Sequence, residues 1–315
     1  MLNRRQLRVR VLHMLYAYQN DGEDTNLKLW KKKLHGMVDT VEKEFYFIAY
    51  IISQLSLLEE ADVKQRADKW VPTEEDKRAI AKMAENPFIK VLQESSDLAY
   101  HVKKHKLAHH EDASVVRSIF REVKKSSHYR EYLASENDPQ KDRKFLVAVF
   151  NHYILPNELF QQHFEEIFIT WPVDEETVEV LVNKFLKNFP YQVETPPDLY
   201  QYPPSWDEDM KFMEQLFEVT LKSGDEFSDF VANKSKNWDV ERLAVLDNII
   251  LKMAISEFLY FESIPVKVSL NEYIDISKNF STPKSKKFVN GVLDKILKSF
   301  KEEGKIKKTG RGLQE

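Results

Sequence analysis

The sequence predicts an all-α fold, and three observations support this. First, long stretches place apolar residues three and four positions apart, which is the period of an amphipathic helix. Second, the alternation of apolar and polar residues that marks a strand is hard to find between turn signals. Third, the 315 residues include only 7 glycines, too few and too scattered for the phosphate-binding loops of nucleotide-binding α/β folds. The 20 phenylalanines and 13 tyrosines still provide a substantial core.

Capping residues and prolines predict where the helices begin. Thr73 precedes an acidic turn, Asp138 precedes a proline and Thr282 precedes another proline, and each arrangement is typical of a helix start. Acidic residues after Pro172 suit the positive end of a further helix. In chain order, the expected helices are 4–20, 27–58, 74–85, 88–107, 111–125, 127–134, 139–155, 157–170, 174–188, 207–222, 225–234, 239–262, 266–280 and 283–301.

Two segments are expected to be non-helical. The stretch from Pro190 to Trp206 contains five prolines, which cannot continue a helix, and it predicts a connector that divides the chain near residue 205. Residues 302–315 place Gly304, Gly310 and Gly312 among lysines, which predicts a disordered basic tail.

Charge is distributed unevenly along the chain. The net charge is −4, yet residues 1–20 contain four arginines and no acid, and residues 276–315 contain eleven basic residues against four acidic ones. The middle of the chain is therefore strongly acidic. Two basic ends favour a polyanion-binding surface, because attraction to phosphates depends on the local field. The alternative interpretation is ordinary solvated helix faces followed by a flexible tail.

Several classes of protein are excluded by what the sequence lacks. There is no cysteine, which removes disulfide frameworks, thiolate nucleophiles and iron–sulfur ligation, and this favours a reducing cytoplasm. The longest apolar run, Phe45 to Ile52, is far shorter than the roughly 20 residues of a membrane-spanning helix. Arg8, Arg10 and His13 interrupt any signal-peptide core. We expect a cytoplasmic protein without membrane contact.

The first helix is expected to be apolar on two sides and therefore sandwiched. Its apolar residues form one stripe of Leu7, Val11, Met14 and Tyr18 and an opposite stripe of Val9, Leu12 and Tyr16. Arg5 flanks the second stripe, which suits a protein partner or RNA. The alternative is that Tyr16 is buried between two layers of its own fold.

The last helix carries the sharper signal. Lys284, Lys286 and Lys287 crowd its first turn, where free backbone N–H groups already present positive charge, and this favours a bound phosphate. Phe288 lies off the core stripe on the same side as Gly291, so it is a candidate for base stacking with single-stranded RNA. The alternative is that Phe288 covers a neighbouring helix.

These two regions resemble the NusB family of transcription antitermination factors. The segment RRQLRVRVLHMLYAYQ (Arg4 to Gln19) is similar to the arginine-rich first helix of the family. The pieces IPVKVSLNEYI and KKFVNGVLDKI, between Ile250 and Leu297, resemble its C-terminal helices more strongly. The resemblance covers residues 1–20 and about 207–300, and it implies an all-α NusB-like bundle of two helical subdomains enlarged by a central helical insertion. The expected regions are 1–58 with the arginine-rich helix, 59–205 with the insertion and connector, 206–301, and the tail at 302–315.

The resemblance implies a binding function with neither catalysis nor a cofactor. Members of the family pair with the ribosomal protein NusE, bind the single-stranded boxA element of ribosomal RNA transcripts, and act in the RNA polymerase antitermination complex. Carried over by motif, the RNA-contacting residues are Arg4, Arg5, Arg8, Lys284, Lys286, Lys287 and Phe288, and the partner-side residues are Tyr16 and Glu257. Lys252 stands where relatives commonly have Arg, which keeps the charge. Lys284 and Lys286 stand where an acid and a His are common, and they make this RNA patch more basic.

Three other functions are compatible with parts of the sequence. His101, His105 and His109 recur at a helical spacing that can place imidazoles on one face for zinc, although interspersed lysines favour a solvated basic face and no metal site is expected. A NusB-like domain also occurs fused to RNA cytosine methyltransferases, but these need a thiolate and a doubly wound cofactor domain. The sequence has no cysteine and no glycine-rich βα turn, which excludes this function. The remaining alternative is a helical interaction scaffold that has lost or altered its RNA specificity.

Overall fold

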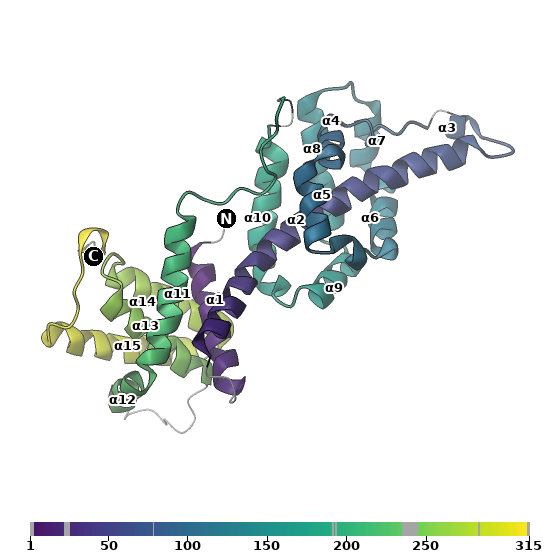
Figure 1. Cartoon of the computed structure of the whole chain (residues 1–315). Coiled ribbons are helices and arrows are strands. Elements are labelled where there is room, and N and C mark those ends of the chain that lie inside the picture. Colours follow the sequence, from purple (N-terminus) through teal and green to yellow (C-terminus); the bar gives the residue numbers. More distant parts are fainter. Residues whose placement is uncertain are drawn as a thin grey trace. The chain divides into compact units, whose positions relative to one another are not determined.

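A computed structural model describes residues 3–21, 26–77, 79–190, 192, 194–234, 245–282 and 284–313. Throughout these residues the regular structure is helical, without a strand, which confirms the predicted all-α class (Figure 1). The chain forms two compact units: a terminal unit of residues 2–36 and 203–315, and a central unit of residues 37–202. The expected boundary at residues 58–59 lies inside a single long helix, α2 (Leu27–Ala67).

The terminal unit is built around one buried helix. Its helices are α1 (Arg4–Asp21), the start of α2, α11 (Trp206–Lys222), α12 (Gly224–Lys234), α13 (Val245–Tyr260), α14 (Val266–Phe280) and α15 (Ser285–Glu302). In Figure 1 the purple α1 lies among the green and yellow helices of the second half of the chain. α13 contacts all five of α1, α11, α12, α14 and α15. It is buried on several sides rather than along one stripe, and its Ala254, Ile255 and Phe258 are fully buried, as expected for a helix enclosed by others.

The start of α2 is attached to α11 by polar contacts. The imidazole of His35 lies 2.6 Å from a carboxylate oxygen of Glu214, and Lys31 forms ion pairs with Glu214 and Glu218. The terminal unit therefore gathers segments from both ends of the sequence.

The central unit is an aromatic helical bundle. It comprises the rest of α2 and the α-helices α3 (Glu74–Lys77), α4 (Pro87–Glu94), α5 (Ser96–Lys104), α6 (Ala113–Lys125), α7 (Ser127–Ala134), α8 (Pro139–Val149), α9 (Glu158–Ile167) and α10 (Trp171–Asn188), with the 3₁₀ turn η1 (Leu107–His110) and the π-helical turn η2 (Phe150–Ile154). Phe164 is at the centre of the core: its ring centroid is 4.1 Å from that of Phe160, 4.8 Å from that of Trp171 and 5.3 Å from that of Phe47.

Most helices end within a few residues of their expected positions, and the exceptions have local causes. The expected helix 88–107 divides at Ser95, whose backbone is extended and whose Oγ accepts a hydrogen bond from the Leu98 amide at 3.1 Å. The expected helix 74–85 is reduced to Glu74–Lys77, and the helix expected at 27–58 continues to Ala67. The start of the helix expected at 239–262 lies outside the described residues.

Residues 303–313, expected to be disordered, pack against the end of α13. The Lys308 ammonium donates hydrogen bonds to the carbonyls of Glu257 (3.2 Å) and Phe261 (2.8 Å), and the Thr309 amide donates to the Glu262 carbonyl at 3.0 Å. Gly310 has a φ of +52°. A Cβ atom at Gly312 would lie 1.9 Å from the Glu262 carbonyl oxygen. These glycines therefore allow a left-handed backbone and a close approach that other residues would oppose.

No helix in the described part of the chain is both long enough and apolar enough to cross a membrane.

Candidate nucleic-acid interface

Arg4 and Arg5 of α1 lie at the surface and are held by acidic residues of neighbouring helices. Arg4 Nε lies 3.1 Å from an oxygen of Asp209 in α11. The Arg5 guanidinium donates to both carboxylate oxygens of Glu272, at 2.9 and 3.0 Å, and to Asp275 at 3.0 Å, both in α14. The hydrogen bond to Glu272 leads the effects that raise the pKa of Arg5 above its usual value. Both side chains remain partly exposed, so a phosphate can reach them from solvent.

Arg8, also expected to contact RNA, has a different environment from Arg4 and Arg5. It is buried, and its guanidinium donates to the buried carboxylate of Glu257 in α13, at 2.8 Å from Nε and 2.6 Å from Nη2. Ser269 and Tyr273 of α14 donate to the same carboxylate, at 2.6 and 2.9 Å. Burial opposes the charge on Arg8, but the hydrogen bond and charge of Glu257 outweigh it and raise the arginine's pKa.

Glu257, expected to lie on the partner side, is buried in the same arrangement. Its four side-chain hydrogen bonds, two from Arg8 and one each from Ser269 and Tyr273, join α1, α13 and α14 in the interior of the terminal unit. Neither Arg8 nor Glu257 presents its charge to solvent, so their role in this structure is to hold helices together.

The first turn of α15 presents three exposed lysines. The side chains of Lys284, Lys286 and Lys287 are exposed and form no ion pair with any residue that the structure describes. Ser285 between them is buried, and its Oγ donates to Asp247 of α13 at 2.7 Å. This serine therefore fixes the start of α15 while its neighbours point outward. Three like charges at a positive helix end constitute a strong local anion attractor.

Phe288 is buried, with 8% of its surface exposed, which corrects its expected role as an exposed stacking ring. It lies at the edge of a broad core face whose other members are Val289, Val292, Leu293, Ile296 and Phe300. The helical wheel places Phe288 off this stripe, but the bundle covers a wider arc of α15 than the stripe alone. The alternative interpretation, in which Phe288 covers a neighbouring helix, agrees with the structure.

The basic groups on α1 and α15 lie along the same helix, α14. Arg5 pairs with Glu272 near the middle of α14, whereas the His13 ring packs edge-on against Phe280 at its end, with centroids 5.4 Å apart. Lys284 begins the next helix four residues later. Residues 272 and 280 are separated by about 12 Å along a helix axis, at 1.5 Å per residue. Arg5 is therefore paired with α14 about 12 Å from the end of that helix, after which the chain leads into α15.

The structure shows a second basic surface. A groove of about 970 Å³ runs between α14, α15 and the C-terminal segment, and its lysines are Lys267, Lys298, Lys301, Lys307 and Lys308. The sequence does not predict this surface, because residues 302–315 were expected to be disordered. One sequence feature does indicate that this segment packs: Ile306 and Leu313 are apolar residues among the lysines, and both line the groove. We call this surface the C-terminal groove.

Tyr16, expected to face a partner, lies on the outside of α1. Its side chain is 44% exposed, which excludes the alternative in which it is buried between two layers. Val9 and Leu12 of the same predicted stripe are buried, so α1 is sandwiched over its first turns and opens to solvent at Tyr16.

Comparison with known proteins confirms the C-terminal part of the resemblance seen in the sequence. Residues 181–298 match the NusB family. The transcription antitermination protein NusB of Salinibacter ruber is 46% identical over 102 residues, which is 32% of this chain and 64% of that protein. The protein of the same name from Chloroherpeton thalassium is 38% identical over 108 residues, 33% of this chain and 51% of its own. A third, from Natranaerobius thermophilus, is 36% identical over 86 residues, 27% of this chain and 62% of its own.

The matched segments thus span between about half and two-thirds of the length of these relatives. The family match includes α11 to α14 and most of α15, and it begins at residue 181, earlier than the position of about 207 expected from the sequence. Residues before it form an extra region, consistent with an insertion. No solved structure matches this chain.

Proposed function

We propose, on the premise that residues 181–298 are a NusB family domain, that this protein is a transcription antitermination factor. It binds boxA-type RNA of ribosomal RNA transcripts together with the ribosomal protein NusE, and it acts by assembling these partners within the RNA polymerase antitermination complex. The three curated relatives carry the name transcription antitermination protein NusB, which supports this class of function.

The single observation that carries the RNA-binding proposal is the lysine turn of α15. Lys284, Lys286 and Lys287 are exposed and unpaired within the described structure, at a helix start fixed by the Ser285–Asp247 hydrogen bond. A preorganised cluster of cations at free backbone N–H groups binds phosphates without first breaking ion pairs. Arg4 and Arg5 extend this surface, although a phosphate must there compete with Asp209, Glu272 and Asp275.

The NusE contact is assigned to the exposed part of α1 around Tyr16. An exposed tyrosine provides a large apolar ring and a hydroxyl group, which is the kind of side chain that anchors protein interfaces. It lies on the helix that carries Arg4 and Arg5, so RNA and protein partner can be bound by one helix.

The test is a fluorescence-anisotropy titration of a short boxA-like RNA and a scrambled RNA of the same composition, with and without NusE, at two salt concentrations. We expect selective binding of the boxA-like RNA that NusE strengthens. The variant Lys286→Gln/Lys287→Gln should bind more weakly and lower the slope of log affinity against log salt by about 1.4, at about 0.7 for each lost phosphate contact with a single strand.

The matched control is Lys184→Gln/Lys187→Gln, which removes two exposed charges from α10 of the central unit. If the control loses as much affinity as the first-turn variant, the lysine turn is not the phosphate site. Equal, weak binding of both RNAs that salt abolishes would overturn the antitermination role and favour the scaffold alternative, with altered RNA specificity.

A further inference from the structure

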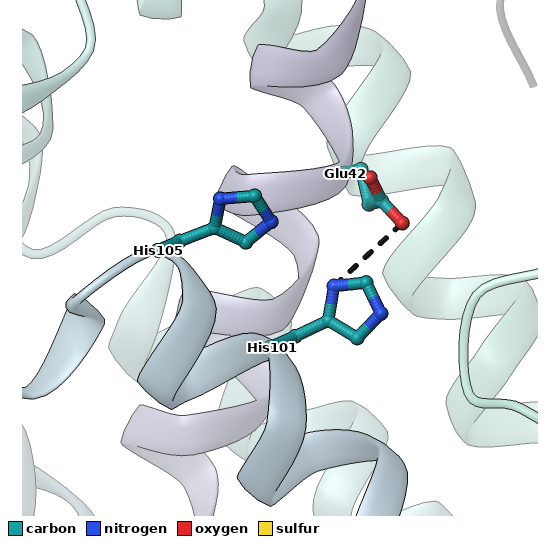
Figure 2. A group of neighbouring side chains, drawn as sticks. All are labelled: Glu42, His101 and His105. Carbon is teal, nitrogen blue, oxygen red and sulfur yellow. Dashed lines mark ion pairs between the residues drawn. The ribbon is translucent and has the colours of Figure 1, made fainter.

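Three potential metal ligands converge in the central unit. Figure 2 shows the rings of His101 and His105, one helical turn apart at the end of α5, pointing toward the carboxylate of Glu42 on α2. One donor atom from each residue lies within 4.8 Å of the other two. His109, which the sequence groups with these histidines, instead lies exposed on η1. The third member of the cluster therefore comes from a helix about 60 residues away in the sequence.

The donor atoms of the two histidines are buried without hydrogen bonds. Neither Nδ1 of His101 nor Nε2 of His105 has a hydrogen-bond partner in the described structure, and His101 is only 8% exposed. The nearest oxygen of Glu42 is 3.7 Å from His101 Nδ1, too far for a good hydrogen bond. A buried acceptor without a partner costs about 1–3 kcal/mol. A cation between the three groups would satisfy all of them at once.

The surroundings hold the His101 ring in the orientation that a metal needs. The ring stacks on Tyr46 with centroids 3.9 Å apart and planes 5° apart. Its other nitrogen, Nε2, faces a carboxylate oxygen of Asp97 at 3.6 Å, and Tyr46 donates a hydrogen bond to Asp97 at 2.7 Å. At 3.6 Å this is an electrostatic contact rather than a hydrogen bond, but it places a carboxylate on the side of the ring where metal-bound histidines usually have one.

The protonation state also suits metal binding. Burial, followed by the charges of Lys104, Lys43 and His101, lowers the pKa of His105 to about 4, so its ring is neutral at physiological pH. Neutral imidazole is the form that binds metal. Glu42 supplies the negative charge of the cluster.

We propose that Glu42, His101 and His105 bind one Zn²⁺ ion, with water as the fourth ligand. Two imidazoles and one carboxylate form a typical zinc ligand set. Bonds of about 2.0–2.1 Å require donor atoms closer together than the apo cluster holds them, and rotation of the Glu42 and His105 side chains can close the difference. The bound ion cross-links α5 to α2 in the extra region, where it stabilises the fold independently of any RNA-binding role.

The experiment is isothermal titration of zinc sulfate into the metal-free full-length chain, with Co²⁺ absorption spectroscopy as a second measurement. We expect one ion per chain, visible cobalt bands typical of tetrahedral coordination, and a melting temperature that rises with zinc. His105→Gln and Glu42→Gln should each lower the affinity at least tenfold and abolish the melting shift. These variants avoid the more deeply buried His101, whose replacement also removes the stack on Tyr46.

The matched control is His109→Gln, which removes a histidine four residues further along the chain but outside the cluster. It should bind zinc as tightly as the unaltered protein. Absence of zinc binding would overturn the proposal. So would binding that survives in both His105→Gln and Glu42→Gln, since the ion would then lie elsewhere, for example at the stacked pair His128 and His152. An equal loss in His109→Gln would indicate adventitious binding by surface histidines.

Discussion

Arg8 and Glu257 form a buried, bidentate ion pair between α1 and α13, with donor–acceptor distances of 2.8 and 2.6 Å. They are 249 residues apart in the sequence. The pair ties the start of the chain to the helix at the centre of the terminal unit. It also gives one residue of the arginine-rich helix a structural partner, because the charge of Arg8 is matched inside the protein.

Removing one member of this pair should destabilise the protein strongly. Arg8→Ala leaves the Glu257 carboxylate buried without its cation, and we expect the free energy of unfolding to fall by about 3–5 kcal/mol. Urea unfolding measures this. Arg5→Ala is the control, because its half-exposed ion pairs should contribute only about 0–1 kcal/mol. Equal losses in the two variants would contradict the structural role assigned to Arg8.

The packing of the C-terminal segment depends on Gly312. Gly312→Ala places a methyl group against the Glu262 carbonyl, where the Cβ atom would lie 1.9 Å from the oxygen, so we expect residues 305–313 to leave α13. Trypsin should then cleave faster after Lys308, whose ammonium is no longer held by the Glu257 and Phe261 carbonyls. Gly36→Ala is the control, since nothing lies within 4 Å of its added Cβ. Unchanged cleavage of Gly312→Ala would show that the segment does not depend on this contact.

Acid should weaken the packing of α1 through His13. Burial, followed by the charge of Arg10, lowers the pKa of His13 below its usual value. As pH falls below about 6.5, the unfolded chain therefore binds a proton that the folded chain resists, and stability is lost. We expect the free energy of unfolding to decrease between pH 7.5 and 5.5, and to decrease less in His13→Gln. A variant with the same pH dependence as the unaltered protein would remove His13 as the cause.

Tyr16 should affect the protein partner and leave the fold intact. Because the ring is 44% exposed, Tyr16→Ala should change the free energy of unfolding by less than about 0.5 kcal/mol. If Tyr16 anchors NusE, the affinity for NusE should fall at least tenfold, as measured by calorimetry. Tyr260→Ala, at a tyrosine of similar exposure on α13, is the control. Unaltered NusE binding by Tyr16→Ala would place the contact elsewhere.

Local patterns in the sequence predict the helices well, but they do not predict which residues the charged side chains contact. The stripe of Val289, Val292 and Leu293 is buried as the helical period requires, because burial of apolar side chains depends on spacing within one helix. The partner of Arg8 cannot be found this way, because Glu257 approaches only once three helices have packed. The glycines of the C-terminal segment are ambiguous for a similar reason: Gly312 indicates flexibility in a sequence but permits close packing in the structure. Glu42 joins His101 and His105 only through the contact of two helices.

The acids that surround Arg5 have a consequence for selectivity. Glu272 and Asp275 already occupy the guanidinium, so an incoming phosphate must displace a carboxylate before it gains anything. For a polyanion attracted by charge alone, replacing a carboxylate by a phosphate on Arg5 gains almost no binding free energy. An RNA that is also held by other contacts can make this replacement. In the proposed RNA-binding role, the two acids therefore favour an RNA that is also held by other contacts over an unspecific polyanion, and they lower the affinity that Arg5 itself can contribute.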